Sequence, residues 1–280
     1  MAFRTFRLTI AILLATAAAV AQTATVSNEP PAAAVADEVV DRILTRLEAR
    51  RVESLHAQVR WELEYTIAEE DEPPDTKLGD LWYQEGAPVA RFKAHFRAKL
   101  ADGVRRPLDE QHLFDGNWYI ELQAQTKTIT RREVRAADDR RNPYKLGEGA
   151  FPVPFGQKKA DILREFEVVR VAPAANDPPG ADHLRLRPRS GTHTGERYES
   201  LSFWVAREGD NAGLPVKVRA AKKDGTGKVN SNITLTFSDI RANEPIAADV
   251  FEIVTPPGFQ EIVERLEAGP TAETVVPAKP

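Results

Sequence analysis

The sequence of 280 residues contains no cysteine. This absence excludes disulfide bridges, thiolate zinc sites, iron–sulfur clusters and a cysteine nucleophile. It also excludes a lipid-modified cysteine, so any lipid that the protein handles is expected to be cargo and not an anchor. With 42% hydrophobic and 29% charged residues, the composition is that of a globular protein with an ordinary core.

An excess of positive charge is also missing. The chain has 38 Lys and Arg against 42 Asp and Glu, which gives a formal net charge of −4. Nucleic-acid-binding proteins usually carry a concentrated basic surface, whereas the bases here are spread along the chain and matched by acids. We therefore expect no nucleic-acid partner.

Long hydrophobic runs are scarce, and the one present lies near the N-terminus. Residues 8–20 carry no charge, follow Arg4 and Arg7, and end in the small residues around Ala21. This layout predicts a cleaved signal peptide over residues 1–21. An uncleaved anchor helix is disfavoured because the run is shorter than the ~20 apolar residues that span a bilayer. Export to the periplasm is the expected outcome.

The rest of the chain shows no internal repeat and no linker between domains. Residues 22–36 and 268–280 are rich in Ala, Thr and Pro, and we predict a flexible lead-in and a flexible tail there. A single domain, expected to be monomeric, is predicted over residues 37–267. It opens with an amphipathic helix at 37–50, whose acidic start and basic end suit the helix dipole.

After this helix the hydrophobic period changes to two, which predicts β-strands. In the strand predicted at 88–100, Ala90, Phe92, Ala94, Phe96 and Ala98 are expected to face inward, and the residues between them outward. The fold class is mainly β, with about ten antiparallel strands in a single large curved sheet or open barrel. The other strands are predicted at 55–67, 111–114, 118–122, 127–134, 166–171, 183–186, 200–205, 215–221, 230–237 and 250–253, with a short helix at 158–165.

No familiar catalytic or metal-binding pattern is present. The histidines, which are His56, His95, His112, His183 and His193, form no His-Glu-x-x-His motif. The chain has no Gly-x-Ser-x-Gly motif of a nucleophile elbow. We therefore expect no enzyme, no metal site and no cofactor.

Large apolar side chains on the inward strand faces are the most informative feature that remains. Two interpretations stay open: the helix and sheet pack to a closed core, or they leave an apolar cavity suited to acyl chains. In the second case, the predicted ligand-binding residues are Leu44, Leu47, Trp61, Leu63, Phe92, Phe96, Trp118, Ile120 and Phe203.

Several short motifs follow one another in a distinctive order. Gly-Asp-Leu-Trp-Tyr at 79–83 is followed by Pro-Val-Ala-Arg-Phe at 88–92 and Asp-Gly-Asn-Trp-Tyr at 115–119. Near the end, Phe251 precedes Pro-Pro-Gly at 256–258. This order resembles the LolA-like family of periplasmic lipoprotein carriers, whose fold is shared by LolB and RseB. The other matching segments lie at 214–218, 233–237 and 243–246.

The resemblance implies an open antiparallel barrel of about eleven strands with helices forming a lid. It also implies a carrier or chaperone that binds the acyl chains of lipoproteins, or another lipid, for delivery to the outer membrane. Its partners would be an inner-membrane transporter and an outer-membrane receptor, with no cofactor and no metal. One departure stands out: Glu85 lies where the family has a basic residue that latches the lid.

Two other functions are kept as alternatives. A lipid-sensing regulatory module similar to RseB would bind lipid and change its affinity for a membrane protein without ferrying cargo. An enzyme acting on a lipid ester would show saturable turnover that is lost on mutation of His112 or His193.

Overall fold

The computed structural model describes residues 32–66, 73–86, 90–134 and 155–266. The predicted signal peptide and tail lie outside these residues, and so does most of the predicted lead-in. The strands are β1 (Ser54–Tyr65), β2 (Asp75–Gln84), β3 (Arg91–Ala101), β4 (Val104–Phe114), β5 (Trp118–Gln123), β6 (Thr128–Glu133), β7 (Phe166–Val171), β8 (Ala181–Pro188), β9 (Tyr198–Ala206), β10 (Pro215–Lys223), β11 (Val229–Ala242) and β12 (Gln260–Glu264). The helices are α1 (Ala32–Ala49), α2 (Lys159–Glu165), α3 (His193–Arg197) and the 3₁₀-helix η1 (Ala248–Phe251).

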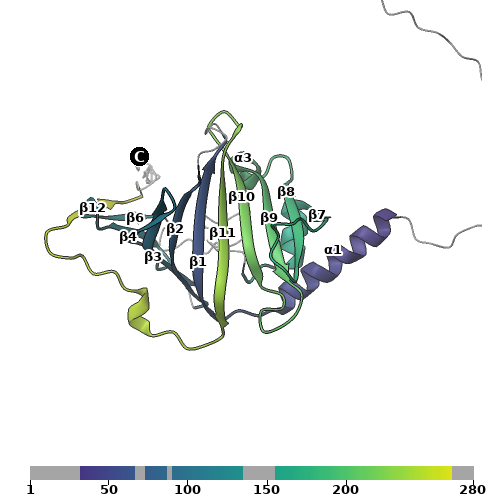
Figure 1. Cartoon of the computed structure of the whole chain (residues 1–280), viewed down its shortest axis with the longest axis horizontal. Helices are drawn as coiled ribbons and strands as arrows, with labels where there is room; N and C mark the ends of the chain where they lie inside the picture. The colour runs from purple at the N-terminus through teal and green to yellow at the C-terminus, as the bar shows by residue number, and fades with distance from the viewer. Residues whose placement is uncertain (1–31, 67–72, 87–89, 135–154, 267–280) are drawn as a thin grey trace, which may run out of the picture.

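All twelve strands belong to one sheet, in the order β12-β6-β5-β4-β3-β2-β1-β11-β10-β9-β8-β7. Strand β12 pairs with β6 in parallel, and the other neighbouring strands are antiparallel. Figure 1 shows β1 and β11 in the middle of the sheet and α1 beside its β7 end. Strands β7 and β12 are the two edges, so the sheet is open, and the mainly β, open barrel-like prediction is confirmed.

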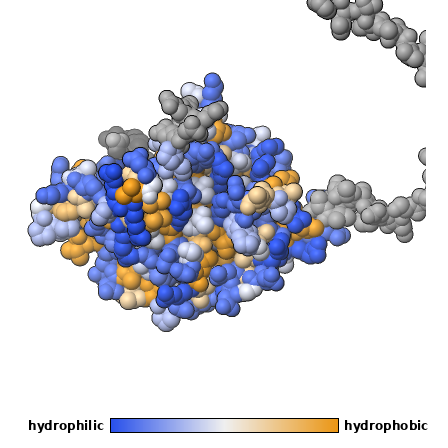
Figure 2. All heavy atoms as spheres, viewed as in Figure 1, coloured by the Kyte–Doolittle hydropathy of each residue, from blue (hydrophilic) through white to orange (hydrophobic). Residues whose placement is uncertain are grey.

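Alternation along the strands gives the sheet two different faces. We call the face that carries Trp61 and Phe96 the inner face, and the opposite one the outer face. The view in Figure 2, in which β1 and β11 lie in front, is predominantly hydrophilic with scattered hydrophobic residues. The large apolar side chains of the main core instead gather between the inner face and helices α1 and α2.

The differences from the predicted elements are local. The strand predicted at 250–253 is wrong: η1 covers its first half, and Phe251 and Ile253 are buried against the outer faces of β4 to β6 without joining the sheet. Helix α1 begins at Ala32, inside the predicted lead-in, where an alanine-rich stretch favours helix. Strand β12 escaped prediction because all five of its residues are exposed, so it has no apolar face to detect.

Helix α1 is held to the β7–β8 end of the sheet by packing and by charge. Val40, Ile43, Leu44 and Leu47 are buried in the main core, and each buried aliphatic side chain contributes ~1.5–3 kcal/mol. The Arg46 guanidinium lies 2.6 Å from the Asp182 carboxylate of β8, whose side chain is only 8% exposed. Arg170 and Arg207 approach the same carboxylate at 3.6 and 3.8 Å.

Replacing Asp182 by asparagine is expected to lower the free energy of unfolding by about 2 kcal/mol, because three arginines lose their shared counter-charge while the site stays partly buried. Denaturant unfolding measures the loss, and faster amide exchange in α1 localises it. Asp210→Ala is the control, since Arg50 binds the backbone carbonyl of Asp210 and not its carboxylate. Equal stability of both variants would contradict the role given to Asp182.

Candidate functional site

The inner face of the sheet encloses a cavity of about 540 Å³. Its walls come from both halves of the sheet and from Phe155, which precedes α2. The rings of Phe155 and Phe237 lie 5.6 Å apart. The lining residues are Val59, Trp61, Lys77, Leu81, Phe92, Ala94, Phe96, Glu110, His112, Tyr119, Glu121, Gln123, Phe155, Tyr198, Leu201, Phe203, Val218, Ala220, Ile233, Leu235 and Phe237.

Most of this lining is apolar. Four of the predicted ligand-binding residues lie in it, namely Trp61, Phe92, Phe96 and Phe203. The rings of Trp61 and Phe96 are 6.4 Å apart, so neighbouring strands present adjacent aromatic surfaces. The sequence left open whether the helix and sheet pack to a closed core or leave an apolar cavity, and the structure contains a cavity.

Three other predicted residues lie away from the cavity lining. Leu44 and Leu47 are buried in the core beneath α1. Leu63 lines a separate hollow near the end of β1, with Tyr65 and Pro74. The structure therefore gives these leucines packing positions, and the cavity wall is made by the strands.

Trp118 and Ile120 also do not line the cavity, and their placement corrects the predicted register of β5. Both pack in a second apolar cluster on the outer face, together with Phe251. The alternate residues of β5, Tyr119 and Glu121, face the cavity instead. The apolar side of β5 turns outward because the segment around η1 covers it, which a strand pattern alone cannot show.

Strand β3 follows its predicted register over most of its length. Phe92, Ala94 and Phe96 line the cavity. Lys93 points the other way as predicted, yet it is buried and its ammonium donates to the Glu252 carbonyl at 3.0 Å.

The inward prediction for Ala98 is wrong because of a β-bulge. Pairing shifts between Phe96 and Ala98, so Ala98 lies opposite Leu78 of β2. Lys77 and Leu81 line the cavity, so alternation puts Leu78 on the outer face. Residues directly opposite in a ladder share a face, and the bulge therefore turns Ala98 outward.

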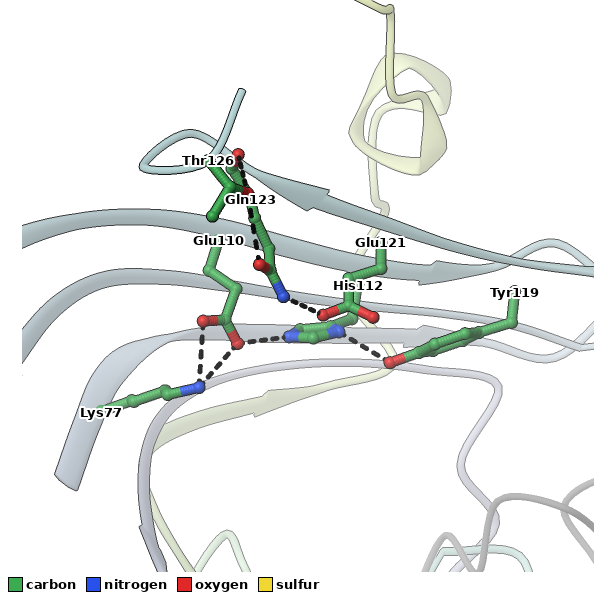
Figure 3. Close-up of polar contacts among 7 residues, drawn as sticks. All are labelled: Lys77, Glu110, His112, Tyr119, Glu121, Gln123 and Thr126. Atoms are coloured by element: carbon green, nitrogen blue, oxygen red, sulfur yellow. Dashed lines mark hydrogen bonds and ion pairs between the residues drawn. The ribbon is translucent and has the colours of Figure 1, made fainter. Parts of the chain in front are cut away.

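One wall of the cavity is polar, and it was not predicted. The Lys77 ammonium donates to both carboxylate oxygens of Glu110, at 2.8 and 2.9 Å. His112 Nε2 lies 2.7 Å from Glu110 Oε1, and its Nδ1 lies 2.7 Å from the Tyr119 hydroxyl. Figure 3 shows these four side chains in a row, with Glu121 and Gln123 beside them. We call Lys77, Glu110, His112, Tyr119, Glu121 and Gln123 the polar wall.

Proton positions in the row follow from the chemistry of the groups. An ionised carboxylate only accepts hydrogen bonds, so His112 Nε2 donates to Glu110. With a neutral ring, Nδ1 then accepts from the Tyr119 hydroxyl. Glu121 accepts from Gln123 at 2.5 Å. Lys77 also lies 4.9 Å above the Trp61 ring, which ties the polar wall to the aromatic one.

Burial and pairing act in opposite directions on Glu110. Burial by itself raises the pKa of this carboxyl, but hydrogen bonds from His112 and Lys77, with the positive charge of Lys77, lower it to about 2. Burial, and then the negative charges of Glu121 and Glu110, raise the pKa of Tyr119. Glu110 is therefore ionised at neutral pH, while Tyr119 keeps its proton.

A row of histidine, carboxylate and tyrosine can in principle serve acid–base chemistry. The raised pKa of Tyr119 makes it a poor nucleophile, and no Ser or Thr hydroxyl lines the cavity within the described part of the chain. His193, the other histidine considered for catalysis, is an exposed residue of α3 paired with Glu196 at 3.2 Å. The arrangement is better suited to holding a polar group than to breaking a bond.

Sequence reasoning missed the polar wall because its residues are far apart in the chain. Glu110 and His112 stand two apart, a spacing that puts both on one face of a strand. That pattern was visible, but placing Trp118 and Ile120 in the cavity implied the opposite face for Tyr119 and Glu121. Within the described ranges, no group of three or more Asp, Glu or His could hold a metal ion, and no helix is long and apolar enough to cross a membrane.

Known proteins provide similarity at the level of solved structures. No family model and no curated protein matches the sequence. An uncharacterized conserved protein from Thermus thermophilus is 12% identical with a TM-score of 0.43, covering 81% of this chain and 99% of its own. A LolA superfamily protein from Nitrosomonas europaea is 11% identical with a TM-score of 0.36, covering 76% and 97%.

A third similar structure is a putative outer membrane lipoprotein-sorting protein domain from Vibrio parahaemolyticus. It is 11% identical with a TM-score of 0.35, and the match covers 78% of this chain and 97% of that one. The Nitrosomonas structure is named as a member of the LolA superfamily, which the sequence motifs resemble, and the Vibrio structure is named for outer membrane lipoprotein sorting. Identities of 11–12% and TM-scores of 0.35–0.43 carry no information about ligand or activity, which the cavity itself must supply.

Proposed function

We propose that the protein is a periplasmic carrier that binds the acyl chains of a lipoprotein, or of another lipid, in its inner cavity. The observation that carries this proposal is an apolar cavity of about 540 Å³ with a single polar wall. Ligand pockets in proteins are roughly 300–1,000 Å³, so one or two folded acyl chains are of suitable size. Burying about ten methylenes at ~0.8 kcal/mol each gives ~8 kcal/mol, which corresponds to micromolar affinity.

The polar wall favours one class of head group. Lys77 is matched by Glu110, and Glu121 adds a further negative charge. Lys77 is the one lysine of the cavity lining, no arginine of the described residues lines it, and Glu110 already binds the Lys77 ammonium, so a fatty-acid carboxylate has no free cation to pair with there. A head group that donates hydrogen bonds, such as an amide N–H or a hydroxyl, fits better. An acylated peptide has such amides, whereas a free fatty acid does not.

Native mass spectrometry of the protein purified from its own periplasm tests the proposal directly, together with uptake of a fluorescent acylated peptide. We expect bound lipid, and tighter binding of the acyl amide than of the free acid of the same length. A protein with no bound lipid and no uptake would exclude a carrier. Transfer to acceptor vesicles separates a carrier from a sensor, which would keep its ligand and instead change its affinity for a membrane partner.

Filling the cavity provides a mutational test. Ala94 lines the cavity and is buried, so Ala94→Leu places three further carbon atoms in the space for the acyl chain. We expect acyl uptake to fall at least tenfold, with stability unchanged or raised by about 1 kcal/mol, as for other cavity-filling changes. Equilibrium binding of the fluorescent peptide and denaturant unfolding measure the two effects.

Ala98→Leu is the matched control on the same strand. Ala98 is 2% exposed and faces outward, so the same substitution overpacks that site at a cost of about 1–3 kcal/mol. Uptake by the folded fraction should be unchanged. If Ala94→Leu destabilised the protein as Ala98→Leu does and left uptake intact, the cavity would not hold the ligand.

A further inference from the structure

A second hollow, on the outer face, has a different chemistry from the cavity. It has a volume of about 430 Å³ and lies over β8, β9 and β10. Ser202 of β9 stands directly between Arg185 of β8 and Arg219 of β10, paired with each in the ladder. The short side chains of Ser200 and Ser202 form its middle, so the hollow exists because the central strand carries small residues between longer ones. We call it the outer pocket.

The floor of the outer pocket is aromatic. His183 and Trp204 stack with ring centroids 4.1 Å apart, and the Trp204 indole N–H donates to Asp177 at 2.6 Å. The Lys217 ammonium lies 4.7 Å over the same indole. Both His183 ring nitrogens are buried without a hydrogen bond in the described structure. Burial lowers the pKa of His183, so this ring adds no charge at neutral pH.

The walls carry an excess of positive charge. Arg185, Arg187, Lys217 and Arg219 line the pocket, against the carboxylates of Asp177 and Glu199. Four cations and two anions leave a net charge of +2. Ion pairs with residues outside the pocket do not change this sum. Glu64 pairs with Arg219 and Lys223 pairs with Glu199, which adds one negative and one positive charge.

Three of these cations make no ion pair with the described residues. They are Arg185, Arg187 and Lys217, and within the same ranges the Ser202 hydroxyl makes no hydrogen bond. Like charges on neighbouring strands destabilise a sheet, so gathering arginines around a hollow has an energetic cost. A bound anion would offset that cost.

We propose that the outer pocket binds a phosphate monoester, with Arg185 and Arg219 on either side of the phosphate and Ser202 beneath it. A phosphate monoester carries between one and two negative charges at neutral pH and can neutralise the net +2, whereas one carboxylate cannot. Guanidinium groups bind phosphate through paired N–H donors. The source is either a soluble phosphorylated compound or the head group of a phospholipid at a membrane surface.

Calorimetric titration of the full chain with glycerol 3-phosphate tests the site. We expect saturable binding that weakens at least tenfold in Arg185→Gln and is lost in Ser202→Leu, which fills the hollow. Arg106→Gln, which removes an exposed arginine of β4, should leave binding unchanged. Acetate at the same concentration should not compete. No binding, binding unaffected by both pocket variants, or equal competition by acetate would overturn the proposal.

Vesicle flotation distinguishes the two sources. Phosphatidylcholine vesicles with and without phosphatidic acid are mixed with the protein and its Arg185→Gln variant. Binding that needs both phosphatidic acid and Arg185 assigns the pocket to a membrane head group, while binding of glycerol 3-phosphate alone assigns it to a soluble compound. Both results are independent of acyl uptake by the inner cavity, which Ala94→Leu reports.

Discussion

Glu110→Gln is expected to lower the free energy of unfolding by about 3 kcal/mol at pH 7. The glutamine keeps the shape of the side chain but leaves the Lys77 ammonium, whose side chain is 21% exposed, without its counter-ion. Removing one partner of a buried ion pair typically costs about 3–5 kcal/mol. His112 also loses its charged acceptor. Denaturant unfolding at pH 7 measures the change.

The lowered pKa of the Glu110 carboxyl also predicts how the free energy of unfolding changes with pH. The pKa of Glu110 is about 2 in the folded protein, below its ordinary value of 4.5. Because the carboxyl has a lower pKa in the folded protein than in the unfolded chain, its ionisation stabilises the fold at pH values above 4.5. This stabilisation is lost as the pH falls from 4.5 towards 2. At about 1.4 kcal/mol per pKa unit, the contribution is about 3 kcal/mol. The Glu110→Gln variant, which has no carboxyl at this position, should therefore lose about 3 kcal/mol less stability than the parent protein between pH 4.5 and pH 2.

Two further variants separate the ion pair from general effects of charge. Glu62→Gln removes a carboxylate from an exposed pair with Arg60 on β1, and should cost less than about 1 kcal/mol. The double variant Lys77→Met with Glu110→Leu removes both charges together, and should recover much of the stability lost in Glu110→Gln. If Glu110→Gln matched Glu62→Gln in stability and in acid profile, Glu110 would not be the buried, paired carboxylate described here.

The parts of the fold that could be predicted are those governed by local alternation. Phe92, Ala94 and Phe96 alternate with polar residues that are exposed or hydrogen-bonded. A single register therefore places every apolar residue of the first part of β3 on the inner face. Trp61 behaves likewise on β1. For such strands, burying the alternate charged side chains would cost several kcal/mol each, which leaves little choice between faces.

The parts that could not be predicted depend on what covers a strand from elsewhere in the chain. Trp118 and Ile120 are as apolar as the residues of β3, but they face outward because Phe251, 133 positions after Trp118, packs over them. Tyr119 then faces the cavity, where it meets His112 from the neighbouring strand. A polar row inside a cavity looks like a solvent-facing row in sequence, because both alternate with apolar residues.

The bulge in β3 shows a third kind of limit. Gly79 of β2 lies opposite Phe96, next to the shift in pairing between β2 and β3. A Cβ atom on Gly79 would lie 2.0 Å from the His95 carbonyl oxygen and 2.7 Å from Phe96 Cα. A glycine inside a strand often marks such a close approach of two backbones. The sequence shows the glycine in β2, but it does not show that the backbone of β3 lies close enough to require it.

Gly79→Ala is therefore expected to destabilise the protein by more than about 3 kcal/mol, at the severe end of single substitutions. The clashing atoms are backbone atoms of β3, so no side-chain rotation relieves the overlap. Strand β3 must move away from β2, which displaces Phe96 from Trp61 and from the ring of His112, 5.8 Å away. Thermal unfolding measures the loss of stability, and acyl uptake should fall in whatever fraction remains folded.

Gly225→Ala is the matched control, because a Cβ atom at Gly225 meets no heavy atom within 4 Å. Its position in the turn between β10 and β11 should make the change neutral to within about 0.5 kcal/mol. The comparison isolates the close approach of β2 and β3, since both variants add the same methyl group to a glycine. If the Gly79→Ala protein were as stable as the Gly225→Ala protein, the backbones of β2 and β3 would be farther apart than described. The position given to Phe96 in the cavity wall would then also be wrong.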